Sequence, residues 1–192
     1  MLDCLFPFLL FGAFIVFAAV LSTIQYSRVR EGFRSLASEF GLEYADQGRW
    51  RYPEVSGEYR GRGVRVYVVV EGSGKHSRVY SVVQVKHRGG VKTKISIRRE
   101  NFGSKLAKMV GYKEIRVGVT DFDDRFYITC QDEAEGRRVL GVDVQQALMN
   151  VKSPLDIEEN IVVAKTLNIQ CRDVISSTLN ALCDVAERLD RV

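Results

Sequence analysis

The chain has 192 residues and a net charge of +4, and its hydrophobic and charged fractions, 46% and 27%, are ordinary for a globular protein. This length suffices for one domain with a sizeable core plus an appendage. The chain shows no internal repeat, low-complexity tract or second domain. Its cysteines have no C-x-x-C spacing and no dense framework, which predicts free thiols at Cys4, Cys130, Cys171 and Cys183.

The N-terminal segment is strongly apolar. From Cys4 to Leu21 it has no charged residue, and residues 22–24 extend the run. About 20 such residues match the length that an α-helix needs to cross a hydrocarbon core of about 30 Å. A signal peptide needs a positive n-region and a small-residue cleavage site, whereas this chain begins with an acidic MLD and offers no such site. We therefore expect a transmembrane anchor over residues 1–24, rather than a cleaved signal or a buried core helix.

The charges beside this segment predict its orientation. Arg28, Arg30 and Arg34 follow it, while its N-terminal side offers only Asp3 and the α-amino group. Basic residues are concentrated on the cytoplasmic side of membrane spans. The sequence thus predicts a single-pass protein of the cell membrane with its C-terminal domain in the cytoplasm.

A helix is expected over residues 25–41, directly after the anchor. Val29, Phe33, Leu36 and Phe40 recur at helical spacing, and Gly41 suits the C-terminal cap of the helix. This apolar stripe is expected to lie on the domain that follows, which we predict to span residues 42–192.

A first β-hairpin is predicted within residues 54–71. With Gly61 and Arg62 as a two-residue loop, Glu58 faces Arg65 on one side of the hairpin, and apolar residues face one another on the other side.

A second hairpin is predicted over residues 78–99, with residues 89–91 as a three-residue loop. This register places Val85 opposite Ile95 on an apolar face. The opposite face would then be basic, with Lys86 facing Lys94. We predict that this face binds an anionic partner through Arg78, Lys86, Arg88, Lys92, Lys94 and Arg98, although a solvated edge hairpin kept from aggregating by its charges is an equal alternative.

The second half of the chain mixes helices and strands. A short helix is expected over residues 101–111, a strand over 125–130, and two helices that start near Asp132 and Asp143. One or two strands follow within residues 160–172. An amphipathic helix from Asp173 ends the chain. This order predicts an α+β fold with a largely antiparallel sheet and a C-terminal amphipathic helix.

The stretch VTDFDDRFYITCQDEAEGRR, residues 119–138, resembles a chemical site more than any other part of the chain. Asp132 and Glu135 fit a capping box at a helix start. Asp121, Asp123 and Asp124 stand where the chain turns into a strand, a place that aspartate favours because its carboxylate binds nearby backbone amides. We interpret these acids as a turn and a cap, and keep a metal-dependent enzyme that uses the three aspartates as the alternative.

Two other patterns argue against cofactors. The loop EGSGKHS, residues 71–77, has strands on both sides, and His76 stands where a phosphate-binding loop needs Ser or Thr. We expect a mobile hairpin loop there. The chain has only His76 and His87, too few for a zinc site or a Ser-His-Asp triad. No cofactor or metal is predicted.

Three short motifs carry a resemblance to an uncharacterised family of membrane-anchored prokaryotic proteins. The family has a G-x-Y-x-G-R hairpin and an F-D-x-x-F-x-V strand that leads into a D-x-x-x-A-R-x-x-L helix. The matching segments here are GEYRGR (57–62), FDDRFYI (122–128) and RRVL (137–140), and the resemblance covers residues 30–148. The chain departs from the pattern at Ile128 and at Gly136. The resemblance implies no catalytic residue, only that these positions support the fold.

Charge gives the sequence its clearest functional indication. Residues 51–100 hold 12 basic and 4 acidic residues, a net of +8. We therefore favour a membrane-tethered, non-enzymatic module that binds a protein or anionic lipid headgroups. Nucleic acid is disfavoured, because Trp50, Tyr67 and Tyr80 form no evident stacking platform.

Overall fold

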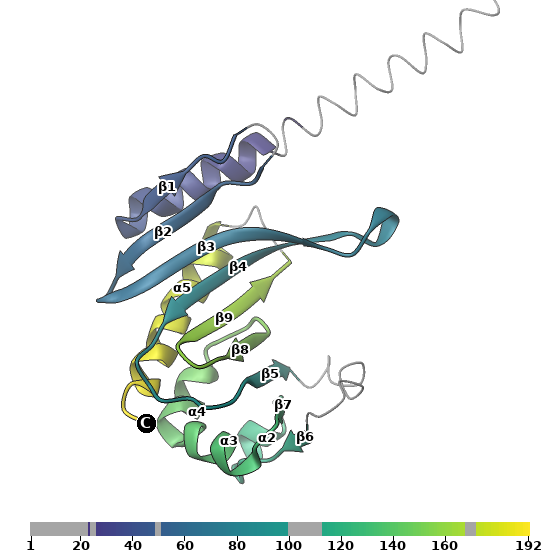
Figure 1. The fold of residues 1–192 in the computed structure, drawn as a ribbon, viewed down its shortest axis with the longest axis vertical. Helices are drawn as coiled ribbons and strands as arrows, with labels where there is room; N and C mark the ends of the chain where they lie inside the picture. Colours follow the sequence, from purple (N-terminus) through teal and green to yellow (C-terminus); the bar gives the residue numbers. More distant parts are fainter. Residues whose placement is uncertain (1–22, 24–25, 49–50, 100–112, 168–171) are drawn as a thin grey trace, which may run out of the picture.

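The framework of the protein is one nine-stranded sheet in which every neighbouring pair is antiparallel (Figure 1). The computed structural model describes residues 23, 26–48, 51–99, 113–167 and 172–192. The strands lie in the order β1-β2-β3-β4-β9-β8-β5-β7-β6. Their bounds are β1 Glu43–Ala45, β2 Glu54–Tyr59, β3 Arg62–Glu71, β4 Arg78–Lys86, β5 Ile95–Arg99, β6 Lys113–Ile115, β7 Phe126–Cys130, β8 Leu155–Ile157 and β9 Ile161–Thr166.

Helices cover one face of this sheet. Residues 26–40 are helical, and the later elements are the 3₁₀ turn η1 (Gly74–His76), α2 (Thr120–Asp123), α3 (Glu133–Val139), α4 (Val142–Leu148) and α5 (Arg172–Leu189). In Figure 1, α5 runs along β4 and β9 while the helix over residues 26–40 lies beside β1 and β2. The predicted α+β class, the antiparallel sheet and the C-terminal amphipathic helix are confirmed.

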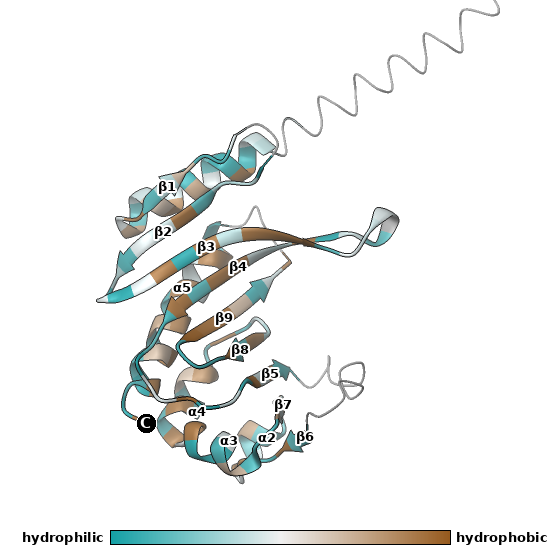
Figure 2. Cartoon of the chain, in the orientation of Figure 1, coloured by the Kyte–Doolittle hydropathy of each residue, from teal (hydrophilic) through white to brown (hydrophobic). Residues whose placement is uncertain are grey.

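The core is built on one continuous row of apolar side chains that crosses the sheet. Strand alternation places every second residue on the helix-covered face, and Figure 2 shows hydrophobic and hydrophilic residues alternating along the strands. The register joins side chains that are at most 4% exposed: Val55, Val66, Val83, Ala164, Leu155, Ile97, Ile128 and Ile115.

The helix after the predicted anchor packs as expected. Val29, Phe33 and Leu36 are each 1% exposed, and the ring of Phe40 meets that of Tyr59 edge-on at 4.8 Å. Gly41 ends the helix with a φ of 65°, a conformation that glycine adopts without strain. The predicted apolar stripe and the glycine cap are confirmed.

The first hairpin forms, but the predicted loop is wrong by one residue. Arg60 and Gly61 make the turn, with φ angles of 54° and 73°, as a type I′ turn requires. Glu58 therefore faces Gly63, and Arg65 faces Ser56 and binds Glu54 at 2.5 Å. Because the partners shift by two residues, each side chain keeps its predicted face.

The second predicted hairpin is wrong. β4 pairs with β3 and β9, whereas β5 pairs with β8 and β7. The β8–β9 hairpin lies between β4 and β5, so the expected pairs of Val85 with Ile95 and of Lys86 with Lys94 do not exist. The local pattern suggested a tight turn at two glycines, but residues 87–94 form a connection that passes two strands.

This connection, residues 87–94, is held at both ends. Near its start, the backbone N–H of Arg88 donates to Asp190 Oδ1 at 2.6 Å, and His87 Nε2 donates to the carbonyl of Glu158 at 2.9 Å. Near its end, the backbone N–H of Lys92 donates to Glu135 Oε1 at 2.9 Å. The connection thus contacts α5, the β8–β9 turn and α3.

Some predicted segments lie outside the described residues. These are the anchor over residues 1–24, apart from Thr23, and the helix over residues 101–111. Among the residues that are described, the chain has no helix with the length and apolarity that a membrane crossing requires. Cys130 and Cys183 are free and buried, as predicted for these two thiols.

We expect Gly89→Ala to lower the free energy of unfolding by about 1–3 kcal/mol, the usual penalty for overpacking. A Cβ at position 89 would lie 2.2 Å from the carbonyl oxygen of Leu189, which is backbone and does not move aside easily. Gly90→Ala is the matched control, because a Cβ there meets nothing within 4 Å. Urea unfolding of the detergent-solubilised chain measures both, and equal effects would contradict this account of the connection.

Candidate functional site

The sheet has an open face opposite the helices, and this face is the strongest candidate for a functional surface. No helix of the described part of the chain lies over it (Figure 1). Its central row is mostly polar and runs beside the apolar core row: Ser56, Arg65, Gln84, Val163, Asp156, Ser96, Thr129 and Glu114. A large sheet with one face exposed is a ready platform for contact with another molecule.

A groove of about 570 Å³ crosses this face over β4, β9, β8 and β5. Its lining includes the apolar side chains of Tyr80, Val163 and Leu167, and Leu167 is 60% exposed. Charged side chains lie among them: Glu71, Arg78, Arg98, Lys152, Asp156 and Lys165. Protein interfaces likewise combine apolar and charged side chains.

Asp156 organises the charges at one end of the groove. Arg98 binds it at 2.7 Å and also donates to the carbonyl of Leu155, and Lys94 Nζ lies 3.1 Å from its other oxygen. Burial alone would raise the pKa of Asp156, but Arg98 and Lys94 more than offset this, so its pKa lies below the usual value. This network is fully ionised at neutral pH and fixes the end of the groove.

The structure disperses the six residues predicted to bind an anionic partner. Arg78 and Arg98 line the same groove from different strands, while Lys86 ends β4 at a distance from them. Lys94 is engaged by Asp156 and by Glu158 at 2.9 Å, and Arg88 and Lys92 lie in the connection. The paired basic face on which the prediction rested is absent, so a common binding role for the six stays a prediction.

The aspartates of the acidic stretch behave as a turn. Asp123 accepts hydrogen bonds from the backbone N–H groups of Val117 and Gly118, both at 2.9 Å. Asp121 and Asp124 are exposed. In the described residues no group of three or more His, Cys, Asp or Glu residues is arranged to hold a metal ion. The favoured interpretation is confirmed for Asp123, and the geometry gives the metal-dependent alternative no support.

The capping box is half confirmed. Asp132 caps α3 by accepting from the backbone N–H groups of Ala134 and Glu135. The side chain of Glu135, however, binds other groups than the start of α3. It is buried, forms an ion pair with Arg138 and accepts a hydrogen bond from the backbone N–H of Lys92 in the connection. Arg138 further donates to the carbonyl of Gly90 at 2.7 Å. Glu135 therefore ties α3 to the connection.

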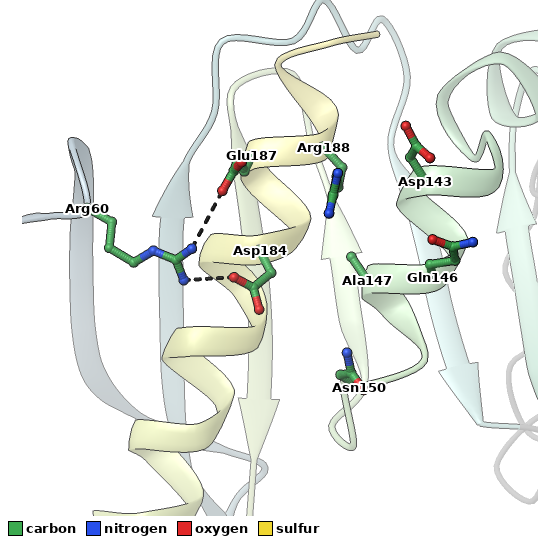
Figure 3. Close-up of a pocket in the computed structure, with 8 residues that line it drawn as sticks. All are labelled: Arg60, Asp143, Gln146, Ala147, Asn150, Asp184, Glu187 and Arg188. Atoms are coloured by element: carbon green, nitrogen blue, oxygen red, sulfur yellow. Dashed lines mark hydrogen bonds and ion pairs between the residues drawn. The ribbon is translucent and has the colours of Figure 1, made fainter.

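A second hollow, a cleft of about 370 Å³, lies between α4 and α5 on the helical side (Figure 3). Arg60 reaches over from the β2–β3 turn to bind Asp184 at 2.7 Å and Glu187 at 3.5 Å. Asp143 lies across the cleft on α4. Arg60 thus links the β2–β3 turn to α5.

Sequence reasoning missed Tyr80, Asp156, Val163, Lys165 and Leu167 as parts of one site. The strand β8 was not predicted, because three residues bounded by Pro154 and an acidic turn give too short a pattern. The alternation along β9 was visible, but nothing local shows that β9 pairs with β4 and β8. The groove exists only through that pairing.

The fold and the groove together define an α+β domain with a groove on an exposed sheet face. Comparisons with models of known protein families and with curated proteins find no match, so the family resemblance stays a prediction. Among solved structures, the chain is similar to the crystal structure of the mycobacterial trehalose monomycolate transport factor A, TtfA. The TM-score is 0.62 at 12% sequence identity, and the match covers 84% of this chain and 94% of that chain. The two proteins share a fold.

We expect Glu135→Gln to lower the free energy of unfolding by about 2 kcal/mol at neutral pH, because Arg138 and the backbone N–H of Lys92 lose a charged acceptor. The hydrogen bonds from Arg138, with help from Lys92, hold the pKa of Glu135 down to about 2 from its usual 4.5. The unfolded chain therefore takes up a proton near pH 4.5, before the folded chain does. The stabilisation is complete above that pH and is lost as the pH falls toward 2.

The control is Glu133→Gln, which breaks an exposed pair with Arg137 on the same helix and should change stability by less than about 0.5 kcal/mol. Denaturant unfolding between pH 7 and pH 3 measures the difference between each variant and the wild type. A Glu135→Gln difference that stays constant over this range would contradict the assignment.

Proposed function

We propose that the chain is a membrane-tethered, non-enzymatic module that binds a protein partner in the groove of its open sheet face. The observation that carries the proposal is the groove itself, in which the apolar side chains of Tyr80, Val163 and Leu167 lie among charged ones. Leu167 exposes 60% of its surface there, which is unfavourable in water without a partner.

The electrostatics of the groove support contact rather than catalysis. Asp156 is neutralised by Arg98 and Lys94, and Glu71 by Lys165. Paired charges of this kind give an interface orientation and specificity. A reaction centre instead needs a group free to accept or donate a proton near neutral pH.

The similarity to TtfA supports the same role. That protein is named as a transport factor, and we infer an accessory role of this kind for the present chain, with no claim about the cargo. The apolar run from Cys4 to Leu21 and the arginines at 28, 30 and 34 support a tether to the cell membrane, with the domain in the cytoplasm.

The tether predicts that the full chain stays with the membrane fraction after an alkaline carbonate wash. A C-terminal alkaline phosphatase fusion should be inactive, and a C-terminal green fluorescent protein fusion should fluoresce. Deleting residues 1–24 should release the protein into the soluble fraction. Recovery of the intact full chain in the soluble fraction would refute the tether, and an active phosphatase fusion would refute the orientation.

The groove predicts that Leu167→Asp lowers the recovery of the partner about tenfold in pull-downs from detergent-solubilised membranes, a loss typical of one interface anchor. The matched control is Val142→Asp, because Val142 is also 60% exposed but starts α4 on the helical side. Quantitative mass spectrometry compares proteins recovered with the wild type and with the two variants. An equal loss of the partner in both variants, or no loss in either variant, would contradict binding at the groove.

A further inference from the structure

The strands β3 and β4 continue past the rest of the sheet as a two-stranded ribbon, residues 67–80. β2 pairs with β3 only as far as Val66, and β9 pairs with β4 only from Ser81 onward. The β3–β4 ladder nevertheless extends to Glu71 and Arg78, and Figure 1 shows the ribbon projecting away from the sheet. Beyond Val66 and Ser81, the ribbon has no neighbouring strand among the described residues and is free to contact another surface.

The ribbon lies on the side of the molecule where the predicted anchor ends. The side chains of Tyr26 and Tyr52 stack at 5.0 Å, and both line one groove with Val68 and Val70 of the ribbon. The predicted anchor ends at residue 24, so Tyr26 lies within about 7 Å of the membrane end of that segment even if the chain is fully extended. Tyrosines are enriched at membrane interfaces.

The composition of the ribbon suits a membrane surface. Its stem is apolar and Val70 is 55% exposed, whereas its end is hydrophilic, as Figure 2 shows. The end has the sequence GSGKHSR, residues 72–78, with two basic residues, one histidine and no acid. Glu71, which lies opposite Arg78 in the β3–β4 ladder, is engaged by Lys165. Residues 72–78 therefore carry a net positive charge.

The end of the ribbon is also compact. Gly72 and Gly74 have φ angles of 89° and 58°, and a Cβ on Gly72 would lie 2.7 Å from the carbonyl oxygen of His76. The 3₁₀ turn Gly74–His76 closes the hairpin, and after Ser77 the exposed Arg78 begins β4. The basic residues are thus gathered on one tight turn.

We infer that the β3–β4 ribbon is a second contact with the membrane, and that its end binds the anionic headgroups of the bilayer that holds the N-terminal segment. The inference rests on the proposed function, because the anchor places the ribbon at the surface. Attraction between basic residues and an anionic leaflet acts within about a Debye length and weakens with salt. Two contacts fix the domain against the bilayer, with the open-face groove beside the ribbon.

The test uses the full chain reconstituted into vesicles of phosphatidylcholine, with or without an equal part of phosphatidylglycerol. A photo-crosslinking amino acid replaces Ser73 at the end of the ribbon. In a second protein it replaces Glu159, an exposed residue of the β8–β9 turn. That turn lies at the far end of β4, where Lys86 pairs with Ile161. We expect at least tenfold more lipid adduct from position 73 than from position 159 in the anionic vesicles, and less adduct at high salt.

Charge-reversal variants distinguish lipid binding by the end of the ribbon from attraction due to the net charge of the whole protein. Lys75→Glu with Arg78→Glu should lower the adduct at position 73 at least fivefold. Arg88→Glu with Lys92→Glu makes the same change in net charge at the other end of the molecule, and it should leave the adduct unchanged. Equal adducts at positions 73 and 159, or equal effects of the two double variants, would overturn the inference.

The outcomes also distinguish the proposed ribbon contact from the proposed membrane tether. A chain that resists carbonate extraction but gives no excess adduct at position 73 refutes the ribbon contact and leaves the tether intact. Equal adduct in vesicles with and without phosphatidylglycerol refutes the requirement for anionic lipid. A chain that carbonate removes from the vesicles refutes the tether and the ribbon contact together.

Discussion

The connection over residues 87–94 is the constraint on which the rest of the sheet depends. It must carry the chain past β9 and β8, which lie between β4 and β5, so neither strand can hold the other in place directly. It donates hydrogen bonds to three separate parts of the fold. The acceptors are Asp190 after α5, the carbonyl of Glu158 in the β8–β9 turn, and the carboxylate of Glu135 on α3. These contacts act together with the pairing of β9 with β4 and of β8 with β5, which joins the two halves of the sheet.

The open face follows from this arrangement. Because β8 and β9 fill the middle of the sheet, their outward residues become the floor of the groove, and Asp156 meets Arg98 from the neighbouring β5. The groove also reaches Glu71 and Arg78, the last pair of the β3–β4 ladder. The binding surface and the projecting ribbon are thus parts of one continuous structure, and a partner in the groove would lie next to the proposed membrane contact.

Local features were predictable from the sequence and pairing between distant strands was not. The spacing of Val29, Phe33 and Leu36 defined a helix and its buried stripe, and Asp132 marked the start of α3, because such signals act within a few residues. The first hairpin kept its faces despite the shifted turn, since alternation survives a two-residue change of partner. The pairing of β4 with β9 joins residues about 80 positions apart, and no local pattern encodes it. Glu135 illustrates the same limit: its spacing suggested a cap, while its partner Lys92 lies on a distant segment.

The late position of β8 and β9 in the chain has a consequence for biosynthesis. At about 5–20 residues per second, translation takes roughly 4–15 s to pass from the end of β4 to the start of β9. During that interval one edge of β4 and one edge of β5 have no strand to pair with, and unpaired edges of this kind recruit other chains. The nascent protein is therefore most exposed to aggregation after its N-terminal half has been made and before residues 155–166 emerge.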